Sequence, residues 1–240
     1  MGLAPRRALM LRARAVLKRT LDVALAATLL LVLVPVVLVI AVAIKIDSRG
    51  PIFYKCRRAG FRGAEFGMLK FRKMYDGALG LALTAADDER FTHVGRLLAR
   101  TKLDEIPQLF NVLRGQMSLV GPRPEDPRFV GLEQEKYRTI LGVRPGITGL
   151  SQLAFARESE ILDPSDRVGH YIRAIFPQKV AIDVFYARSW SIHMDLVILA
   201  WTGLAVIARR EVAVNRVTGD LSLRHREPSP SPVVESSQAA

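Results

Sequence analysis

The sequence has few of the residues that form disulfides or zinc sites. Its 240 residues include a single cysteine, Cys56, so no disulfide can form within the chain. A reducing compartment is the simplest interpretation of that scarcity. The four histidines are scattered, and none has a cysteine or another histidine at the spacing of metal ligands. The sequence therefore predicts no zinc site.

Acidic residues are also scarce relative to basic ones. The chain carries 23 Asp and Glu against 35 Lys and Arg, a formal net charge of +12. This balance favours an anionic partner, such as anionic lipid, nucleic acid or a phosphorylated substrate. Aromatic residues make up only 7% of the chain, and they do not form the stacking pattern that single-strand binders use. We therefore predict that nucleic acid is not a partner.

The sequence is rich in apolar residues near its N-terminus. Residues 1–19 contain six basic side chains and no acidic one, which suits either a basic helix on anionic lipid or a disordered basic arm. An apolar run of 22 residues then extends over 23–44, interrupted by one threonine. About 20 residues are needed for a helix to cross a bilayer. The run is too long for a removable signal peptide, and no convincing cleavage site follows it.

Pro35 and the flanking charges distinguish two membrane arrangements. Pro35 lies near the middle of the apolar run, where it removes a helical hydrogen bond and bends the helix. Basic clusters flank the run on both sides, and basic residues stay on the cytoplasmic face of a membrane. A re-entrant helix, which bends at Pro35 and leaves on the face it entered, keeps both clusters there. The residues favour this arrangement slightly over a crossing helix, and both remain open.

Residues 100–124 carry the densest chemistry. Asp104 and Glu105 are adjacent, and Pro107 follows them at a position that suits the first turn of a helix. We predict a helix that begins near Asp104 and ends at Gly115. Both carboxylates would then lie at the positive end of the helix dipole. The alternative for Asp104 is a purely structural N-cap.

The segment Gly121-Pro122-Arg123-Pro124 holds an arginine between two prolines. Prolines restrict the backbone on both sides, so Arg123 is expected to be extended and its guanidinium to be presented at low entropic cost. Such a guanidinium can bind a phosphate through two hydrogen bonds. The basic residues at 70–73 are further phosphate-binding candidates. The alternative for them is an ordinary solvated basic face.

The remaining pattern predicts an α+β domain that is mostly helical with a small sheet. Short strands are expected at 52–54 and 66–71, and a turn at 144–149 is expected to enter a strand that ends at 153. Helices are expected at 94–99, 125–141, 167–190 with an interruption at Pro177, and 196–208. Residues 211–240 are expected to form a disordered tail, because periodicity is lost there and the end is rich in proline and serine.

In their order along the chain, these motifs resemble the bacterial sugar transferase family, the monotopic polyprenyl-phosphate phosphoglycosyl transferases. The resemblance covers about residues 18–208. It rests on Lys18-Arg19, Asp22, Gly50-Pro51-Ile52-Phe53-Tyr54, Lys70-Phe71-Arg72-Lys73-Met74, Arg90-Phe91-Thr92, Gly95-Arg96, Leu103-Asp104-Glu105-Ile106-Pro107-Gln108, Asn111-Val112-Leu113, residues 115–124, Pro145-Gly146-Ile147-Thr148-Gly149, Gln152, Asp183, Tyr186 and Asp195. One departure is Val34, where relatives often carry a serine before the proline.

The resemblance implies a fold and a location. It implies a basic segment at 1–19, a re-entrant membrane helix at 20–46 that breaks at Pro35, and a catalytic domain at 47–210 with interfacial amphipathic helices. It further implies the minimal catalytic form, without an additional N-terminal membrane domain. Such a protein would be monotopic in the bacterial inner membrane, with the catalytic domain facing the cytoplasm.

The resemblance also implies a reaction. A phosphosugar passes from a nucleotide-diphosphate sugar, expected to be a UDP-sugar, to polyprenyl phosphate, expected to be undecaprenyl phosphate, with release of UMP. Asp104 would be the nucleophile, and Asp104 and Glu105 would hold Mg²⁺, with Glu105 also able to assist proton transfer. The implied phosphate- and nucleotide-binding residues are Lys70, Arg72, Arg90, Pro122, Arg123, Pro124 and Arg157. Membrane lipid is a further expected partner, and a homodimer is compatible with the resemblance.

Two other functions remain open at this point. A membrane-attached glycosyltransferase that moves only the sugar would release UDP instead of UMP. A basic membrane scaffold would catalyse nothing. The motifs do not distinguish between sugars, polysaccharide pathways or polyprenol lengths.

Overall fold

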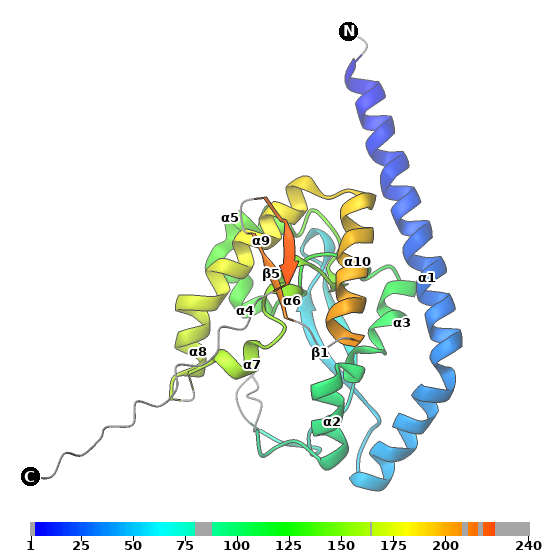
Figure 1. The fold of residues 1–240 in the computed structure, drawn as a ribbon, viewed down its shortest axis with the longest axis vertical. Helices are drawn as coiled ribbons and strands as arrows, with labels where there is room; N and C mark the ends of the chain where they lie inside the picture. Colours follow the sequence, from blue (N-terminus) through cyan, green and yellow to red (C-terminus); the bar gives the residue numbers. More distant parts are fainter. Residues whose placement is uncertain (1–2, 80–87, 164, 208–210, 216–217, 224–240) are drawn as a thin grey trace, which may run out of the picture.

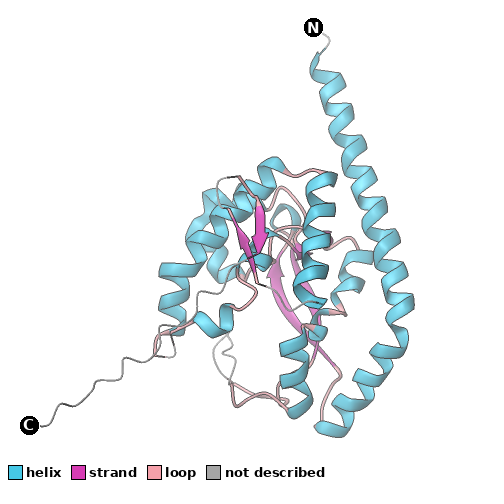
Figure 2. Ribbon diagram, viewed as in Figure 1, coloured by secondary structure: helices cyan, strands magenta, loops and turns pink. Residues whose placement is uncertain are grey.

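In the computed structural model, which describes residues 3–79, 88–163, 165–207, 211–215 and 218–223, the chain is mostly helical with short strands (Figure 2). The helices are α1 (Leu3–Asp47), α2 (His93–Thr101), α3 (Gln108–Leu113), α4 (Pro127–Val130), α5 (Gln134–Ile140), α6 (Leu150–Ala154), α7 (Glu158–Ile161), α8 (Arg167–His170), α9 (Phe176–Ser189) and α10 (Ile192–Ile207). The strands are β1 (Phe53–Ala59), β2 (Glu65–Phe71), β3 (Ser118–Val120), β4 (Gly146–Thr148), β5 (Val212–Val214) and β6 (Leu221–Leu223). The predicted fold class, α+β and mostly helical, is confirmed.

Each of these strands pairs with one other strand, so the predicted small sheet is divided into separate pairs. β1 and β2 are antiparallel, β3 and β4 are parallel, and β5 and β6 are antiparallel. The parallel pair brings the start of the Gly121-Pro122-Arg123-Pro124 segment beside the turn at 145–149. The expected strand ending at Leu153 is wrong, because β4 lies within the predicted turn at 144–149 and a helix follows it. The chain turns into α6 at Leu150, because Leu150 and Leu153, three residues apart, both face the core from one side of a helix.

Both predicted long helices of the C-terminal half are divided, and for the second one an interruption at Pro177 was predicted. Residues 125–141 form α4, a 3₁₀ turn at Gly131–Glu133 and α5. Residues 167–190 form α8, a π-helical turn at Tyr171–Ile175 and α9, which has Pro177 in its first turn. Proline is accommodated there because the first N–H groups of a helix have no intrahelical acceptor. π-helical turns occur frequently at functional sites.

β5 and β6 lie in the segment 211–240, for which the sequence predicts disorder. That prediction does not hold for these two strands. Their pairing has a packing reason, because Val212 is buried in the main hydrophobic core. Residues 224–240, which contain the proline- and serine-rich end, lie outside the described residues.

α1 runs along one side of the molecule, and its N-terminal part projects beyond the rest (Figure 1). Within the part of the chain that the structure describes, its stretch Arg12–Asp47 is the one helix long and apolar enough to cross a membrane. The helix is continuous through Pro35, so the re-entrant break remains a prediction. One face of the helix packs on the domain, through Ala26, Ile40 and Ile44 among others, while other apolar side chains such as Leu31 are exposed.

Polar side chains attach the N-terminal end of this apolar stretch to the domain. Lys18 pairs with Asp195 on α10 and donates to the carbonyl oxygen of Val120 at 3.1 Å. Asp22, which is buried, accepts a hydrogen bond from the Ser118 hydroxyl at 2.7 Å. The Lys18 and Asp22 motif positions of the sequence are therefore docking contacts to β3 and α10.

The other end of the apolar stretch is attached as well. The carboxylate of Asp47 accepts a hydrogen bond from the backbone N–H of Val94 at 2.9 Å, at the start of α2. Arg72, just after β2, donates to the carbonyl oxygens of Arg49 and Ser48, the latter at 2.8 Å. These carbonyls lie just beyond the end of α1, where carbonyl groups need partners from outside the helix.

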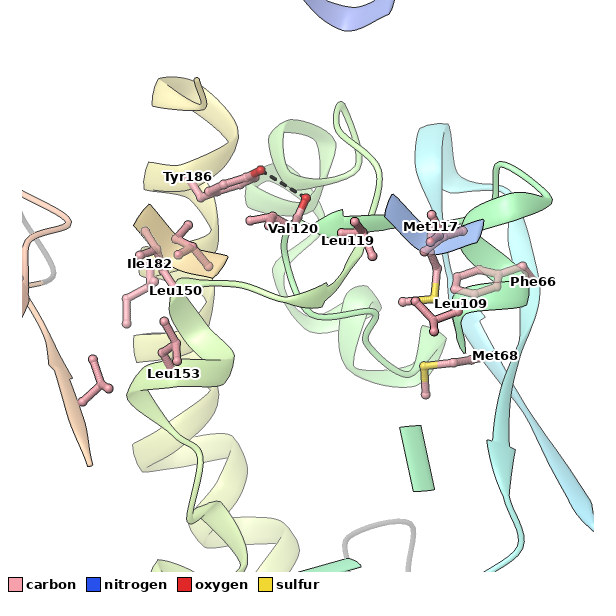
Figure 3. Packing of buried hydrophobic residues seen from close by; sticks show 14 residues of the cluster. Phe66, Met68, Leu109, Met117, Leu119, Val120, Leu150, Leu153, Ile182 and Tyr186 are labelled. Carbon is pink, nitrogen blue, oxygen red and sulfur yellow. Dashed lines mark hydrogen bonds between the residues drawn. The ribbon is translucent and has the colours of Figure 1, made fainter. Parts of the chain in front are cut away.

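The main hydrophobic core lies between the β1–β2 pair and α9 and includes residues of β3 (Figure 3). Phe66 and Met68 of β2 belong to the part of the core next to α3. Leu150, Leu153 and Ile182 pack together in the part of the core next to α9. The Tyr186 hydroxyl donates to the carbonyl oxygen of Val120 at 3.2 Å, across the core. β3 is thus held from both sides, and the segment that follows it starts from a fixed point.

Candidate active site

Asp104 and Glu105 lie in a short 3₁₀ turn, Leu103–Glu105, between α2 and α3. Lys102 ends α2 in a left-handed conformation, with φ of 59°, and this reverses the chain into the turn. α3 follows at Gln108, and Gly115, with φ of 80°, stands just beyond its end. The predicted helical segment is confirmed, with the difference that its first turn is a 3₁₀ turn. The helix dipole near the two carboxylates is therefore only that of the short α3.

Asp104 lies between two lysines. Its side chain is only 2% exposed, and its Oδ2 atom is 3.8 Å from Nζ of Lys70 and 3.5 Å from Nζ of Lys73. Oδ2 is buried and has no hydrogen-bond partner among the described residues. Neither the 3₁₀ turn nor α3 has a side-chain capping hydrogen bond, so the N-cap alternative for Asp104 is wrong. A buried carboxylate oxygen without a partner is expected to have a ligand or a chemical role.

Glu105 is held by the same lysine. Its Oε1 accepts a hydrogen bond from Lys70 at 2.7 Å. Burial alone would raise the pKa of Glu105, but the charges of Lys70 and Arg123 outweigh burial and lower the pKa to about 2. Glu105 is therefore a carboxylate at neutral pH. It is suited to bind a cation, and its lowered pKa makes it a weak base and a poor proton donor.

The two lysines differ in their electrostatic surroundings. Burial opposes the charged form of Lys70, but Glu105 and Asp104 outweigh burial and raise its pKa. Burial dominates at Lys73, where it lowers the pKa despite the opposing effect of Asp104. The sequence analysis includes Lys73 among the basic candidates at 70–73 but does not place it at Asp104. In the structure Lys73 lies two residues beyond the end of β2 and reaches Asp104.

Hydrogen bonds fix the 3₁₀ turn Leu103–Glu105 relative to Lys70 and Lys73. The fully buried amide of Asn111 on α3 accepts from the N–H of Leu69 and donates to the carbonyl of Gly67, both at 2.9 Å. The β2 backbone is thereby joined to α3. Gly95 on α2 approaches the carbonyl of Lys73 so closely that a Cβ atom there would collide with it. The Asn111 and Gly95 motif positions thus set the distance between the strand and the turn.

Arg123 is presented by a tight crossing of two loops. The N–H of Gly146 donates to the carbonyl of Pro122 at 2.8 Å, and the N–H of Gly121 donates to Thr148 at 2.9 Å. A Cβ atom at Gly121 or Gly146 would meet backbone atoms of the other loop, so glycine is required at both crossing points. Pro124 is buried beside Arg123.

The guanidinium of Arg123 is half-buried and forms no hydrogen bond or ion pair with any residue that the structure describes. Burial opposes its charge, but Glu105, Glu158 and Glu125 outweigh burial and raise its pKa. Because Arg123 in turn lowers the pKa of Glu105, its charge and that of Glu105 act on each other directly. The structure therefore brings together Asp104, Glu105, Lys70 and Arg123, with Lys73 added.

Three predicted phosphate-binding arginines have other partners. Arg72 binds the carbonyls beyond α1. Arg90 pairs with Asp88 through its Nε at 2.8 Å and its Nη2 at 2.6 Å, and Arg157 pairs with Glu211 at 3.0 Å. These contacts do not bring the three arginines into the Asp104 cluster. A role for them in phosphate binding stays a prediction.

The donor set at Asp104 fits a magnesium ion that is only partly held by protein. Among the described residues, no group of three or more His, Cys, Asp or Glu side chains could hold a metal. Asp104 and Glu105 supply two neighbouring carboxylates, and Asp104 Oδ2 is without a hydrogen bond. Mg²⁺ is commonly held by one or two carboxylates together with substrate phosphates and water. The residues are compatible with this mode of binding.

Comparison with known proteins identifies a family that this chain resembles. A family model described as bacterial sugar transferase matches residues 13–209. An undecaprenyl-phosphate glucose phosphotransferase of Komagataeibacter xylinus is 39% identical over 194 residues, which cover 77% of this chain and 35% of that protein. A UDP-glucose:undecaprenyl-phosphate glucose-1-phosphate transferase of Caulobacter vibrioides is 39% identical over 191 residues, covering 77% and 67%. The exopolysaccharide production protein PSS of Rhizobium leguminosarum bv. phaseoli is 38% identical over 203 residues, covering 81% and 96%.

The relatives differ in length. The chain spans about a third of the Komagataeibacter protein, about two thirds of the Caulobacter protein and nearly all of the Rhizobium protein. The matched segment 13–209 contains α1 from Ala13 onward and the whole Asp104 cluster. The similarity therefore extends over the parts of the molecule that the geometry singles out.

Proposed function

The chain belongs to the bacterial sugar transferase family, and from this premise we propose that it transfers a phosphosugar from a UDP-sugar to undecaprenyl phosphate. The relatives' names, undecaprenyl-phosphate glucose phosphotransferase and UDP-glucose:undecaprenyl-phosphate glucose-1-phosphate transferase, support the two substrate classes. The observation that carries the proposal is the buried, unpartnered Oδ2 of Asp104 between Lys70 and Lys73. Such an oxygen can form a bond to phosphorus.

The first half-reaction uses Asp104 as nucleophile. Its Oδ2 forms a bond to the phosphorus that carries the sugar, and the bond from that phosphorus to the bridging oxygen breaks. UMP leaves with the bridging oxygen and its electron pair, and the phosphosugar remains on Asp104 as an acyl phosphate. Covalent catalysis divides one difficult transfer into two easier ones. Lys70 and Lys73 hold the attacking carboxylate and lie where they can neutralise charge on the transferred phosphoryl group.

The second half-reaction restores the carboxylate. A phosphate oxygen of the polyprenyl phosphate attacks the same phosphorus, and the bond to Asp104 breaks, which gives a polyprenyl-diphosphate sugar. Glu105, ionised and held by Lys70, is too weak a base to take a proton efficiently from the incoming phosphate, so we assign it to cation binding and to holding Lys70. Arg123, without an ion pair among the described residues, binds the diphosphate of the nucleotide sugar.

Asp104 and Glu105 would also hold Mg²⁺, which offsets phosphate charge in phosphoryl transfer when it is bound. The assignment is supported by the two adjacent carboxylates, Asp104 and Glu105. The residues alone bind, orient and neutralise the substrates as described above.

The attachments of α1 support a monotopic arrangement on the cytoplasmic face of the inner membrane. Lys18 at one end and Asp47 at the other both bind the same domain. A crossing helix would separate its ends by about 30 Å of hydrocarbon, so both sets of contacts could not form with a domain on one face. Both sets of contacts form in the structure with α1 continuous through Pro35. In a bilayer we propose that the helix bends at Pro35 and leaves on the face it entered, so that exposed side chains such as Leu31 and Val39 contact lipid.

We expect tags placed at residue 1 and at residue 240 to be on the same, cytoplasmic side. The reason is that both ends of the apolar stretch are bonded to one domain. Protease protection of each tag in intact and permeabilised cells measures this. A tag at residue 1 that is accessible from the periplasm would show that the helix crosses, and it would contradict the monotopic arrangement.

The nucleotide that is released tests the reaction itself. Incubation of the full chain in detergent with undecaprenyl phosphate and a panel of UDP-sugars is expected to give UMP with at least one sugar. Chromatography separates UMP from UDP. Release of UDP would identify a glycosyltransferase that moves only the sugar, and no release with any sugar would favour a scaffold. Either result would contradict the proposal.

A further inference from the structure

A group of buried and half-buried polar side chains begins two residues after Arg123. Glu125 follows Pro124 directly, Glu158 is on α7, Tyr171 begins the π-helical turn and Lys179 is on α9. Tyr171 and Lys179 are 1% and 3% exposed. The mechanism proposed above uses none of these four side chains. Buried charges are costly unless they are paired, so their arrangement calls for an explanation.

These four side chains form hydrogen bonds and ion pairs with one another. Nζ of Lys179 is 2.8 Å from Oε2 of Glu158, 3.1 Å from the Tyr171 hydroxyl and 3.9 Å from Oε2 of Glu125. The Tyr171 hydroxyl donates to the same Oε2 of Glu125 at 2.7 Å. Burial and the two carboxylates raise the pKa of the tyrosine, so it keeps the proton that it donates. Each carboxylate therefore has a donor that is not Arg123.

Asp183 on α9 is a further acidic neighbour of Lys179. Burial raises its pKa to about 7, against the lowering effects of the Ser151 hydroxyl and of Lys179. Its Oδ1 has no hydrogen-bond partner within the described part of the chain. Because its charged form is disfavoured, Asp183 competes only weakly for Lys179.

Arg123 and Glu125 line the same small cavity, together with Pro122 and Tyr137. Glu158 and Glu125 are, after Glu105, the strongest influences that raise its pKa. Even so, neither glutamate forms a hydrogen bond or ion pair with Arg123 in the described structure. A guanidinium and a carboxylate in reach of each other readily form a two-hydrogen-bond pair. The donors already present on Glu158 and Glu125 explain why that pair does not form.

We propose that Lys179 and Tyr171 are positioning residues that occupy Glu158 and Glu125 and so keep Arg123 available for the diphosphate of the nucleotide sugar. The proposal rests on the proposed function, since it assigns the phosphate to Arg123. Without Lys179, two half-buried carboxylates would lack a cation, and Arg123 is the cation that could turn toward them. Bound phosphate would then compete with an internal ion pair.

The variant Lys179→Met removes the ammonium and keeps most of the side-chain length. We expect the Kd for UDP, measured by titration calorimetry on the full chain in detergent, to rise about tenfold or more. At saturating UDP-sugar, the rate of UMP release should change by less than about threefold, because the loss is in binding and not in the chemical step. The exposed Lys136, whose Nζ lies 2.9 Å from Glu133, provides the matched control, and Lys136→Met should leave both quantities unchanged.

A purely structural role for Lys179 is excluded by rescue. The double variant Lys179→Met/Glu158→Gln removes one released carboxylate as well, and it should recover most of the lost affinity for UDP. In an Arg123→Ala background, Lys179→Met should have little further effect, because its influence acts through that arginine. Where Lys179→Met fails to fold, Tyr171→Phe removes only a hydroxyl from Glu125 and should weaken UDP binding in the same direction.

The proposal is overturned if folded Lys179→Met or folded Tyr171→Phe binds UDP as tightly as the wild type. It is also overturned if the double variant is no better than Lys179→Met, or if Lys179→Met weakens binding as much in the Arg123→Ala background. Failure of the proposed function gives a different result. In that case the wild type binds UDP but releases no UMP from UDP-sugars, and the comparison of Kd values still tests the role of Lys179.

Discussion

Asp104→Asn is expected to lower the rate of UMP release from a UDP-sugar by at least about 10⁴-fold, as removal of a nucleophile typically does. The amide has nearly the same shape as the carboxylate, but its oxygen is too weak a nucleophile to form the acyl phosphate. The side chain is 2% exposed and lies between Lys70 and Lys73. The measurement is single-turnover release of UMP from radiolabelled UDP-sugar by the purified full chain.

The fold of this variant needs a separate readout, because a buried charge is lost. Asp104→Asn leaves Lys70 with Glu105 as its 2.7 Å partner, so we expect cooperative thermal unfolding and circular dichroism close to that of the wild type. Asp166→Asn is the matched control, because it removes an exposed carboxylate that pairs with Arg173 and an asparagine can still cap α8. Its UMP release should be unchanged. Full turnover by a well-folded Asp104→Asn variant would rule out Asp104 as the nucleophile.

Arg123→Ala is expected to raise the KM for the UDP-sugar by about 30-fold or more, the size expected for loss of a charge-assisted contact to phosphate. The KM for undecaprenyl phosphate should change much less, since the assignment gives Arg123 the nucleotide diphosphate. The variant removes a side chain that has no ion pair within the described residues, so its effect on stability should be small. Initial rates measured against each substrate in turn separate the two constants.

Arg128→Ala provides the control for this experiment. Arg128 is exposed, pairs with Asp126 at 2.9 Å, and lies five residues from Arg123 without belonging to the Asp104 cluster. Neither KM should change in this variant. An equal rise of both constants in Arg123→Ala would indicate a general loss of folding at the loop crossing and would argue against a specific contact with the nucleotide sugar.

The central part of the site could be predicted from the sequence because its signals are local. Two adjacent carboxylates before Pro107 predict a helical start, and the structure places them in a helical turn before α3. Arg123 is restrained by the prolines on either side of it, which is a property of the chain itself. The glycines at 121 and 146 complete that geometry through a crossing with a distant loop.

The parts that could not be predicted depend on contacts between distant segments. Lys73 reaches Asp104 because Gly95 of α2 packs against its carbonyl. The sequence records the charge of Arg72 and Arg157 but not their partners, which in the structure are the carbonyls beyond α1 and Glu211. β5 forms because Val212 finds the main core, which no periodicity in a stretch of three residues could indicate.

The membrane helix also has some features that could be predicted from the sequence and others that could not. Its length and its apolar character are properties of residues 23–44 alone, and the structure contains the corresponding long helix. Its attachment at both ends depends on Asp195, Val120 and Val94, which lie far along the chain from Lys18 and Asp47. A bend at Pro35 is a response to the bilayer as much as to the chain, and tags on the two termini test it.

The mass of the intact protein tests the central claim most directly. The full chain is incubated with a UDP-sugar in the absence of undecaprenyl phosphate, quenched in acid and examined by mass spectrometry. We predict a mass increase of one sugar phosphate, located on Asp104 by peptide fragmentation and removed when undecaprenyl phosphate is added before the quench. Stoichiometric UMP release with no adduct, or an adduct on another residue, would contradict the assignment of Asp104.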